Sequence, residues 1–272
     1  MALYINTNVA SLNAQKLLSR SSGSLENRFE HLATGQKVNS AYDDASGMAI
    51  STRTTAQVRG LNQAARNAND GISFLQVADG ALDETDNMLM RVRELAVQSA
   101  NASNNSTDRA NIQTEVDELL GEVQRLAETR KFNSKNMLDG TFANQTFRIG
   151  EFADKDLTVT IGSATASALG VFGLDMTTAS AAEAAITTLD AAMKKVADIR
   201  VDLGSYQSRL SSAINNLQGI SQETQAMRSQ IMDTDVAKES ALLTQGSVLQ
   251  QAGTAVLAQA NQQPQLALQL LG

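Results

Sequence analysis

The feature that most constrains this chain is a sevenfold repeat of apolar residues in its C-terminal half. Steps of seven from Leu189 trace one apolar row, and positions three residues later trace a second. Two such rows form the seam of a coiled-coil helix, so we expect one long helix over 186–231. The first row is Leu189, Val196, Leu203, Leu210, Leu217, Thr224 and Ile231, and the second is Ala192, Ile199, Tyr206, Ala213, Ile220 and Met227.

Two further segments carry apolar residues in steps of three and four and provide partners for this helix. They cover 54–99 and 112–126, and an Asn/Ser-rich stretch at 101–106 separates them. Thr107 or Asp108 is expected to cap the second of these helices. Three amphipathic helices joined in this way predict a mainly α fold, an elongated antiparallel helical bundle.

Residues 132–180 differ from the helical segments in composition. Small polar and apolar residues alternate over 146–149 and 157–161, around a polar tip at 154–156. This alternation predicts one small β-hairpin within about 140–175. The following stretch, 162–185, is rich in Ala, Ser, Thr and Gly and is expected to be a loop.

The two chain ends each carry a sparse apolar stripe that is too short to hold itself folded in water. Pro264 is expected to end the C-terminal helix. We expect the two ends to pair as a coiled coil and to contact neighbouring molecules. The predicted polymerisation residues are Leu18, Leu25, Phe29, Leu32, Leu242, Leu249, Val256 and Leu257.

Composition argues against several classes of function. The chain has no Cys and one His, His31, so a thiolate or zinc site lacks ligands and a packing role is expected for His31. The net charge of -7 disfavours nucleic acid as a partner. The sequence lacks both an apolar run long enough to cross a membrane and an ordinary signal peptide. No enzyme activity and no cofactor are expected.

Polar clusters have plain structural explanations. Asp43 and Asp44 precede a helix, and Asp233 and Asp235 precede another, so helix capping is favoured over acid–base chemistry. The Gln/Asn-rich tail fits either low-complexity disorder or a polar helix face lining a wet channel.

Several motifs resemble bacterial flagellin. They are INTNVASLNAQ at 5–15, LATGQKVNSA at 32–41, DDASG at 43–47, RNANDGI at 66–72, VRELAVQ at 92–98 and AVLAQANQ at 255–262. The resemblance covers about 1–140 and 185–271.

The resemblance implies a subunit of the flagellar filament for swimming motility, secreted to the extracellular flagellum through the flagellar type III apparatus. It implies a terminal coiled-coil domain of 1–45 plus 233–272 and a bundle domain of 46–232, without outer variable domains. The implied partners are other copies of the chain, an export chaperone that binds 236–271, and the hook-associated junction and cap proteins.

The family also presents a surface to the host Toll-like receptor that senses flagellin. The motif match places this surface at Arg91, Leu95 and Glu115, and Met90 stands where many receptor-activating relatives have Gln. The alternatives to a filament subunit are a hook–filament junction or other axial protein, an enzyme on a helical scaffold, and a cytoplasmic coiled-coil adaptor.

Overall fold

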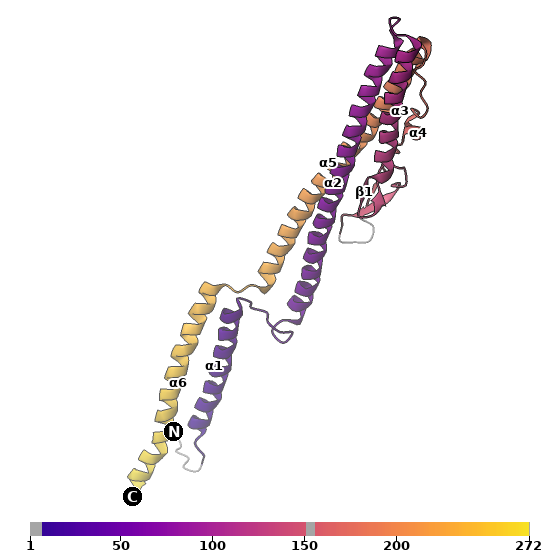
Figure 1. Ribbon diagram of the computed structural model, residues 1–272. Helices are drawn as coiled ribbons and strands as arrows, with labels where there is room; N and C mark the ends of the chain where they lie inside the picture. Colours follow the sequence, from indigo (N-terminus) through magenta and orange to yellow (C-terminus); the bar gives the residue numbers. More distant parts are fainter. Residues whose placement is uncertain (1–6, 151–155, 272) are drawn as a thin grey trace. The chain divides into compact units, whose positions relative to one another are not determined.

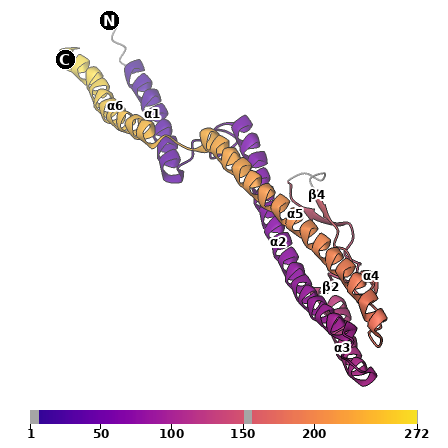
Figure 2. The same ribbon diagram turned by 90° about the horizontal axis from the view of Figure 1, so that it is seen from above.

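The computed structural model describes residues 7–150 and 156–271, with side chains up to Gln263. Helices dominate the chain, which confirms the mainly α class (Figures 1 and 2). Contacts divide it into two compact units, one formed by Met1–Ala56 with Glu223–Gly272 and the other by Gln57–Gln222.

The second unit is an antiparallel bundle of three helices (Figure 1). They are α2 (Ala45–Ala100), α3 (Ser106–Thr129) and α5 (Ala179–Met232), of which α2 and α5 continue into the first unit. Arg200 of α5 pairs with Asp79 of α2 at 2.9 Å, while Arg93 of α2 pairs with Asp190 of α5. Because a later residue of α2 meets an earlier residue of α5, the two helices run antiparallel.

The bundle core confirms most of the predicted seam. The first sevenfold row of α5 is buried from Leu189 to Thr224. The second row begins buried at Ala192 but becomes exposed by Ile220, which is 36% exposed, and Met227, which is 56% exposed. Ile214 and Ser221, each one residue after a position of the second row, are buried instead. The buried face of α5 therefore shifts around the helix toward its C-terminal end.

The N-cap of α3 lies two residues before Thr107, the earlier of the two predicted caps. Asn105 is the N-cap, and its side chain accepts hydrogen bonds from the backbone N–H groups of Thr107 and Asp108. Asp108 returns a bond to the Asn105 N–H, which completes a capping box. The prediction of Thr107 or Asp108 as the cap is wrong because Asn105 satisfies both donors.

Two antiparallel hairpins lie between α3 and α5. Strands β3 (Gln145–Arg148) and β4 (Asp156–Val159) form the predicted hairpin, although residues 154 and 155 of its predicted tip lie outside the described residues. A smaller hairpin of β1 (Lys131–Phe132) and β2 (Lys135–Asn136) was not predicted. Asn133 and Ser134 connect its strands with φ of 48° and 66°, a turn conformation that hydrophobic patterning does not reveal.

The segment predicted as a loop, 162–185, contains a single helical turn, α4 (Ala166–Leu169), and also the start of α5, which begins at Ala179. Thr165 caps its start, and Gly170 ends it with φ of 85°, a value that glycine adopts readily. Lys195 of α5 donates hydrogen bonds to the carbonyl oxygens of Ala168 and Leu169. These bonds fix α4 against α5.

The first unit contains α1 (Val9–Thr34) and α6 (Val236–Leu271), which lie side by side (Figure 1). Helix α6 continues past Pro264, so the expected helix end is wrong. A proline removes only one backbone donor, and neighbouring turns retain theirs.

Of the predicted carboxylate caps, Asp44 and Asp235 are confirmed. Asp43 instead accepts from the N–H groups of Asn39 and Ser40, and Asp233 accepts from the Ser229 hydroxyl. Asp44 accepts a hydrogen bond from the Gly47 N–H at the start of α2. Asp235 accepts from the N–H groups of Ala237 and Lys238 at the start of α6. Both carboxylates satisfy helix N-terminal donors, which is why they lie at these boundaries.

Candidate assembly surface of the terminal helices

Polar contacts fix the register of the antiparallel α1·α6 pair. The Asn8 side chain donates to the Ala260 carbonyl at 2.8 Å, and the Ser11 hydroxyl donates to Asn261 at 2.7 Å. Further along, Gln250 donates to the Ser22 hydroxyl at 3.3 Å. Residue numbers rise along α1 as they fall along α6, so one continuous seam joins the chain ends.

Two glycines of α6 let α1 approach closely. A β-carbon at Gly253 would lie 3.4 Å from Leu18 Cδ1, and one at Gly246 would lie 3.0 Å from Leu25 Cδ1. Leucine side chains of one helix thus occupy the space that glycines leave on the other. The pair is held by a few large side chains over small ones, which gives it a narrow apolar seam.

A buried carboxylate lies at the end of the seam, near the start of α6. Glu239 is 7% exposed and pairs with Arg28 at 2.8 Å, and His31 Nδ1 lies 3.2 Å from the same carboxylate oxygen. Burial by itself raises the pKa of Glu239, but the hydrogen bond and charge of Arg28, together with His31, outweigh it and lower the pKa. His31 therefore has an electrostatic contact beyond the packing role that we expected.

The structure divides the predicted polymerisation residues into two groups. The residues that are half-buried are Leu18, Leu25, Leu32, Leu242 and Leu257. The residues that remain exposed are Phe29, Leu249 and Val256, with 55%, 56% and 60% of their surface open. The seam between the helices therefore shields part of each apolar stripe and leaves the rest uncovered.

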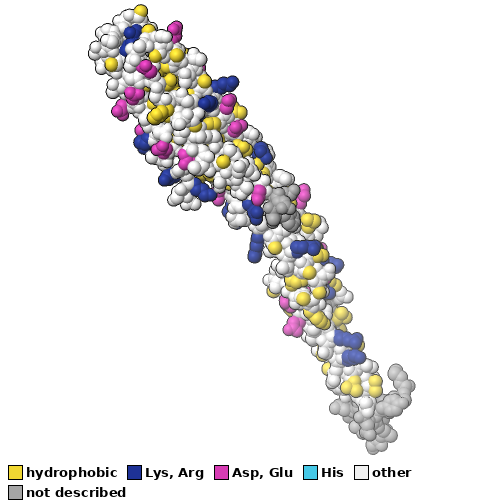
Figure 3. Space-filling view, turned by 90° about the vertical axis from the view of Figure 1, so that its right-hand side faces the viewer, with side chains coloured by type: hydrophobic (Ala, Val, Ile, Leu, Met, Phe, Trp, Pro, Cys, Tyr) yellow, Lys and Arg dark blue, Asp and Glu magenta, His cyan; other side chains and the backbone are white. Residues whose placement is uncertain are grey.

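Apolar residues remain exposed on both helices, and we call them together the outer row. Besides Phe29, Leu249 and Val256, it includes Leu12, Leu17 and Val248, all more than half exposed. Hydrophobic side chains are visible at the surface of the molecule in Figure 3. A pair of helices buries only one face of each member, so these residues need a further partner to leave water.

The residues that set the register of the helix pair were not predicted. A sevenfold row on α6 consists of Glu239, Gly246, Gly253 and Ala260. It was not recognised as an apolar stripe because it contains a carboxylate and two glycines. Arg28 was missed for the same reason. The detectable signal was the shared spacing of Leu18 to Leu25 on α1 and Gly246 to Gly253 on α6.

The predicted receptor residues lie in the second unit and differ in exposure. Arg91 and Glu115 are exposed and form an ion pair of 2.9 Å between α2 and α3. Leu95 is 2% exposed and belongs to the bundle core. Hydrogen bonding to Glu115 and Glu94 raises the pKa of Arg91. The two charges thus largely neutralise each other at the surface.

The part of the chain that the structure describes offers no cluster of His and carboxylate side chains suited to a metal ion. Among the described helices, none combines the length and apolarity that crossing a membrane requires. What the geometry does offer is a chain whose two ends pair and still expose apolar rows. These features define a helical protein built for self-association.

The family comparison agrees with this class. A model of the bacterial flagellin N-terminal helical region matches residues 5–143, and one of the bacterial flagellin C-terminal helical region matches residues 186–271. The chain belongs to the bacterial flagellin family, whose members are structural proteins of the flagellar filament.

Relatives match over nearly the whole chain. The flagellar filament 33 kDa core protein of Treponema phagedenis is 42% identical over 99% of this chain and 100% of its own length. A flagellin of Halalkalibacterium halodurans has the same identity and coverage. Flagellin C of Vibrio cholerae is 34% identical in an alignment of 377 residues that covers both chains completely.

Solved structures share the fold. A crystal structure of Bacillus cereus flagellin has a TM-score of 0.50 and 32% identity, covering 56% of this chain and 88% of that one. A structure described as a flagellar hook-associated protein from Vibrio parahaemolyticus has a TM-score of 0.59, covering 70% of this chain and all of that one. Its 12% identity shows the fold alone.

Proposed function

We propose that this chain is the structural subunit of a flagellar filament and that its outer row makes the contacts between copies. The observation that carries the proposal is the exposure of Phe29, Leu249 and Val256 on a helix pair that already buries its inner seam. The other predicted residues stabilise the α1·α6 pair within one chain; they are Leu18, Leu25, Leu32, Leu242 and Leu257. They hold the pair in the form that presents the outer row.

The energetics favour a cooperative polymer. Full burial of a Val, Leu or Phe side chain contributes roughly 1.5–3 kcal/mol. Ordering the terminal segments opposes assembly by about 1–2 kcal/mol for each backbone residue. A free copy has no partner for its outer row, whereas the end of a growing filament offers several at once. Assembly should therefore need a minimum protein concentration.

Removal of both chain ends tests the proposal. A variant lacking residues 1–40 and 236–272 should remain helical by circular dichroism and form no filaments in electron micrographs. The intact purified protein should form long filaments under the same conditions. Filaments of normal length from the shortened variant would refute the proposed surface. Short capped assemblies from the intact protein would favour a hook–filament junction protein instead.

The proposed domain division places 1–45 with 233–272 in the filament core and 46–232 in the surrounding bundle. We propose that the chain has no outer variable domains, since only a short segment with two hairpins and α4 connects α3 to α5. The alignment of 377 residues with the Vibrio cholerae relative, against 272 in this chain, supports added segments in that longer relative.

We propose that the same C-terminal helix binds partners both before secretion and in the filament. An export chaperone would cover the outer row of 236–271 before secretion to the extracellular flagellum, and junction and cap proteins would meet it in the filament. The absence of Cys is compatible with export of an unfolded chain. Co-purification of the chaperone with the intact chain, but not with a chain ending at residue 235, tests this role.

Host receptor binding is proposed at the Arg91–Glu115 ion pair. Leu95 is buried, so it would stabilise this surface through packing in the bundle core and would not contact the receptor itself. Glu115→Ala and Arg91→Ala should weaken receptor activation by the monomer without affecting assembly. Unchanged activation by both variants would exclude this surface. No enzymatic activity is proposed.

A further inference from the structure

An aromatic side chain projects from the turn between α4 and α5. Phe172 is 78% exposed, although Val171 and Met176 on either side are fully buried. The Gln113 side chain of α3 fixes the turn by donating to the Leu174 carbonyl at 2.8 Å and accepting from the Met176 N–H at 2.6 Å. The Phe172 ring is therefore exposed on an anchored turn, where burial would stabilise it.

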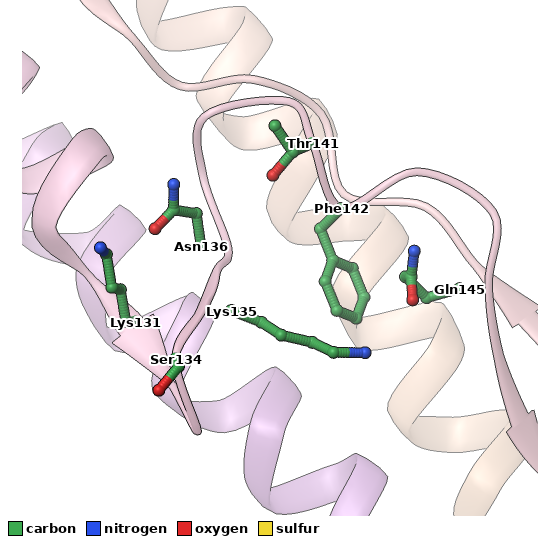
Figure 4. Close-up of a pocket in the computed structure, with 7 residues that line it drawn as sticks. All are labelled: Lys131, Ser134, Lys135, Asn136, Thr141, Phe142 and Gln145. Atoms are coloured by element: carbon green, nitrogen blue, oxygen red, sulfur yellow. The ribbon is translucent and has the colours of Figure 1, made fainter.

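A polar pocket of about 390 Å³ opens beside the β1–β2 hairpin. Its volume is sufficient for one aromatic side chain. Figure 4 shows Lys135 extending toward Gln145, with Lys131 at the other side of the hairpin. The residues that line the pocket include Lys131, Ser134, Lys135, Thr141, Phe142 and Gln145.

The pocket combines positive charge with an aromatic wall. Among the residues that the structure describes, neither Lys131 nor Lys135 has an ion-pair partner. Phe142 stacks on Phe74 with ring centres 4.4 Å apart, and the edge of Phe132 lies against the same ring. Such a site suits an aromatic ring that carries a carboxylate beside it.

The Phe172 turn has this composition. Asp175 is exposed three residues after the ring, and its described hydrogen bonds come from Thr177 in its own turn. Those bonds lower the pKa of Asp175, which keeps it charged. The charge of the turn thus complements that of the pocket.

The turn and the pocket of one chain are too far apart to meet. Gln113 holds the turn, whereas the pocket begins just beyond Thr129, the last residue of α3. The sixteen residues between these positions span about 24 Å of helix. A second copy that lies beside the first and is offset by about this distance along the α3 axis would have its turn at the same height as the pocket.

We propose that the Lys131–Lys135 pocket receives Phe172 and Asp175 of a neighbouring copy of this chain. The proposal rests on the proposed filament function and adds a contact outside the terminal helices. The contact joins two different surfaces, so the copy that offers its pocket still has a free turn, and the copy that offers its turn still has a free pocket. A contact of this kind repeats into an open polymer.

A larger groove between α2 and α5 fits the turn less well. It has a volume of about 680 Å³ and is lined by Met90, Val97 and Met193 among others. Its one cation, Arg93, already pairs with Asp190, and Glu94 adds a negative charge. Asp175 would be repelled there.

Cysteine cross-linking tests the contact directly, because the natural chain has no Cys. Filaments of the Phe172→Cys/Lys135→Cys variant, treated with a short thiol-specific cross-linker, should yield a ladder of covalent oligomers on a denaturing gel. Each single variant should yield no ladder. Normal filaments without a ladder in the double variant would overturn the proposed contact.

A charge exchange provides a second test if cysteines impair assembly. Lys135→Asp and Asp175→Lys should each raise the critical concentration for polymerisation by up to about fivefold. Together they should restore the value of the natural chain. Lys135→Asp with Asp198→Lys, an exposed residue outside both surfaces, should remain impaired. Equal rescue by both pairs would refute a specific contact.

The two proposals fail separately. If the natural chain forms no filaments, the proposed function fails. If the natural chain forms filaments while the cross-links are absent or the charge rescue is unspecific, only the pocket contact fails. A helical reconstruction in which neighbouring bundles show no offset near 24 Å would also contradict the pocket contact.

Discussion

Leu25 of α1 lies directly over Gly246 of α6, so closely that a β-carbon on the glycine would come within 3.0 Å of the leucine Cδ1. This contact lies between the Leu18–Gly253 contact and the Arg28–Glu239 pair along the seam that joins the two chain ends. The leucine is half-buried by it. A glycine in a helix is ordinarily unfavourable by about 1 kcal/mol relative to Ala, so its position here is explained by close packing.

Enlarging this glycine should separate the helices. We expect Gly246→Leu to destabilise the α1·α6 pair by about 1–3 kcal/mol, because the added side chain overlaps Leu25. Gly23→Leu on α1 is the matched control, since nothing lies within 4 Å of its β-position. Amide hydrogen exchange of α1 and α6 in the monomer should accelerate in the first variant and not in the second.

Truncations on the two faces of α6 should have different consequences. Val256→Ala and Leu249→Ala should leave the pair intact and raise the critical concentration for polymerisation by roughly tenfold or more, because their side chains are exposed until copies meet. Leu257→Ala should instead loosen the pair itself. Sedimentation of filaments and amide exchange of monomers separate the two effects. Normal filaments from both outer-row variants would contradict the assignment.

The Glu239 cluster makes the helix pair sensitive to acid. The pKa of Glu239 is lower in the folded chain than its ordinary value of 4.5, so its stabilising contribution is complete above that pH. The contribution is lost as pH falls through the lowered pKa, when the carboxylate gains a proton. Spin labels at Lys16→Cys and Ala255→Cys, both exposed, should move apart in acid.

Glu239→Gln is the control for this prediction. It removes the titrating group, so the distance between the labels should change less over the same pH range. Arg28→Ala should destabilise the pair at neutral pH by about 2 kcal/mol, because the buried carboxylate loses its cation. An identical acid response in Glu239→Gln would exclude this carboxylate as the cause.

The second unit allows a matched test of its core. Leu203→Ala should cost about 2–5 kcal/mol in the free energy of unfolding, because the leucine is 1% exposed within the bundle. Ile220→Ala on the same helix should cost much less, since Ile220 is 36% exposed. Urea unfolding followed by circular dichroism measures the difference. Equal losses would mean that the second sevenfold row stays buried to its end.

The helices and their faces were predictable wherever apolar residues alone determine packing. The row from Leu189 to Leu217 specifies the buried face of α5 because its residues pack in apolar clusters, Leu189 to Leu210 in the main core and Leu217 with Leu61 and Ala64. The sevenfold pattern of α5 could not show where along the helix its packing partners change. Ile220 fits the heptad as well as Ala192 does, yet the two differ in exposure because they meet different neighbours.

The candidate assembly surface was predictable only in part. Leu249 and Leu257 look equivalent in the sequence, but Leu249 is 56% exposed and Leu257 is half-buried. Three-dimensional register decides between them, and that register depends on Glu239, Gly246 and Gly253. Hydrogen bonds and close glycine contacts leave no hydrophobic period in a sequence, which is why the residues that set the register of the seam were not predicted.

The matched spacing of the seam limits how such a chain can change length. Seven residues separate Leu18 from Leu25, and seven separate Gly253 from Gly246. Deleting one residue between the leucines would rotate one of them by about 100° away from its glycine. Lengthening the segment between α3 and α5 would leave both spacings untouched. We therefore expect insertions to be tolerated between α3 and α5 and to disrupt the helix pair when they fall within α1 or α6.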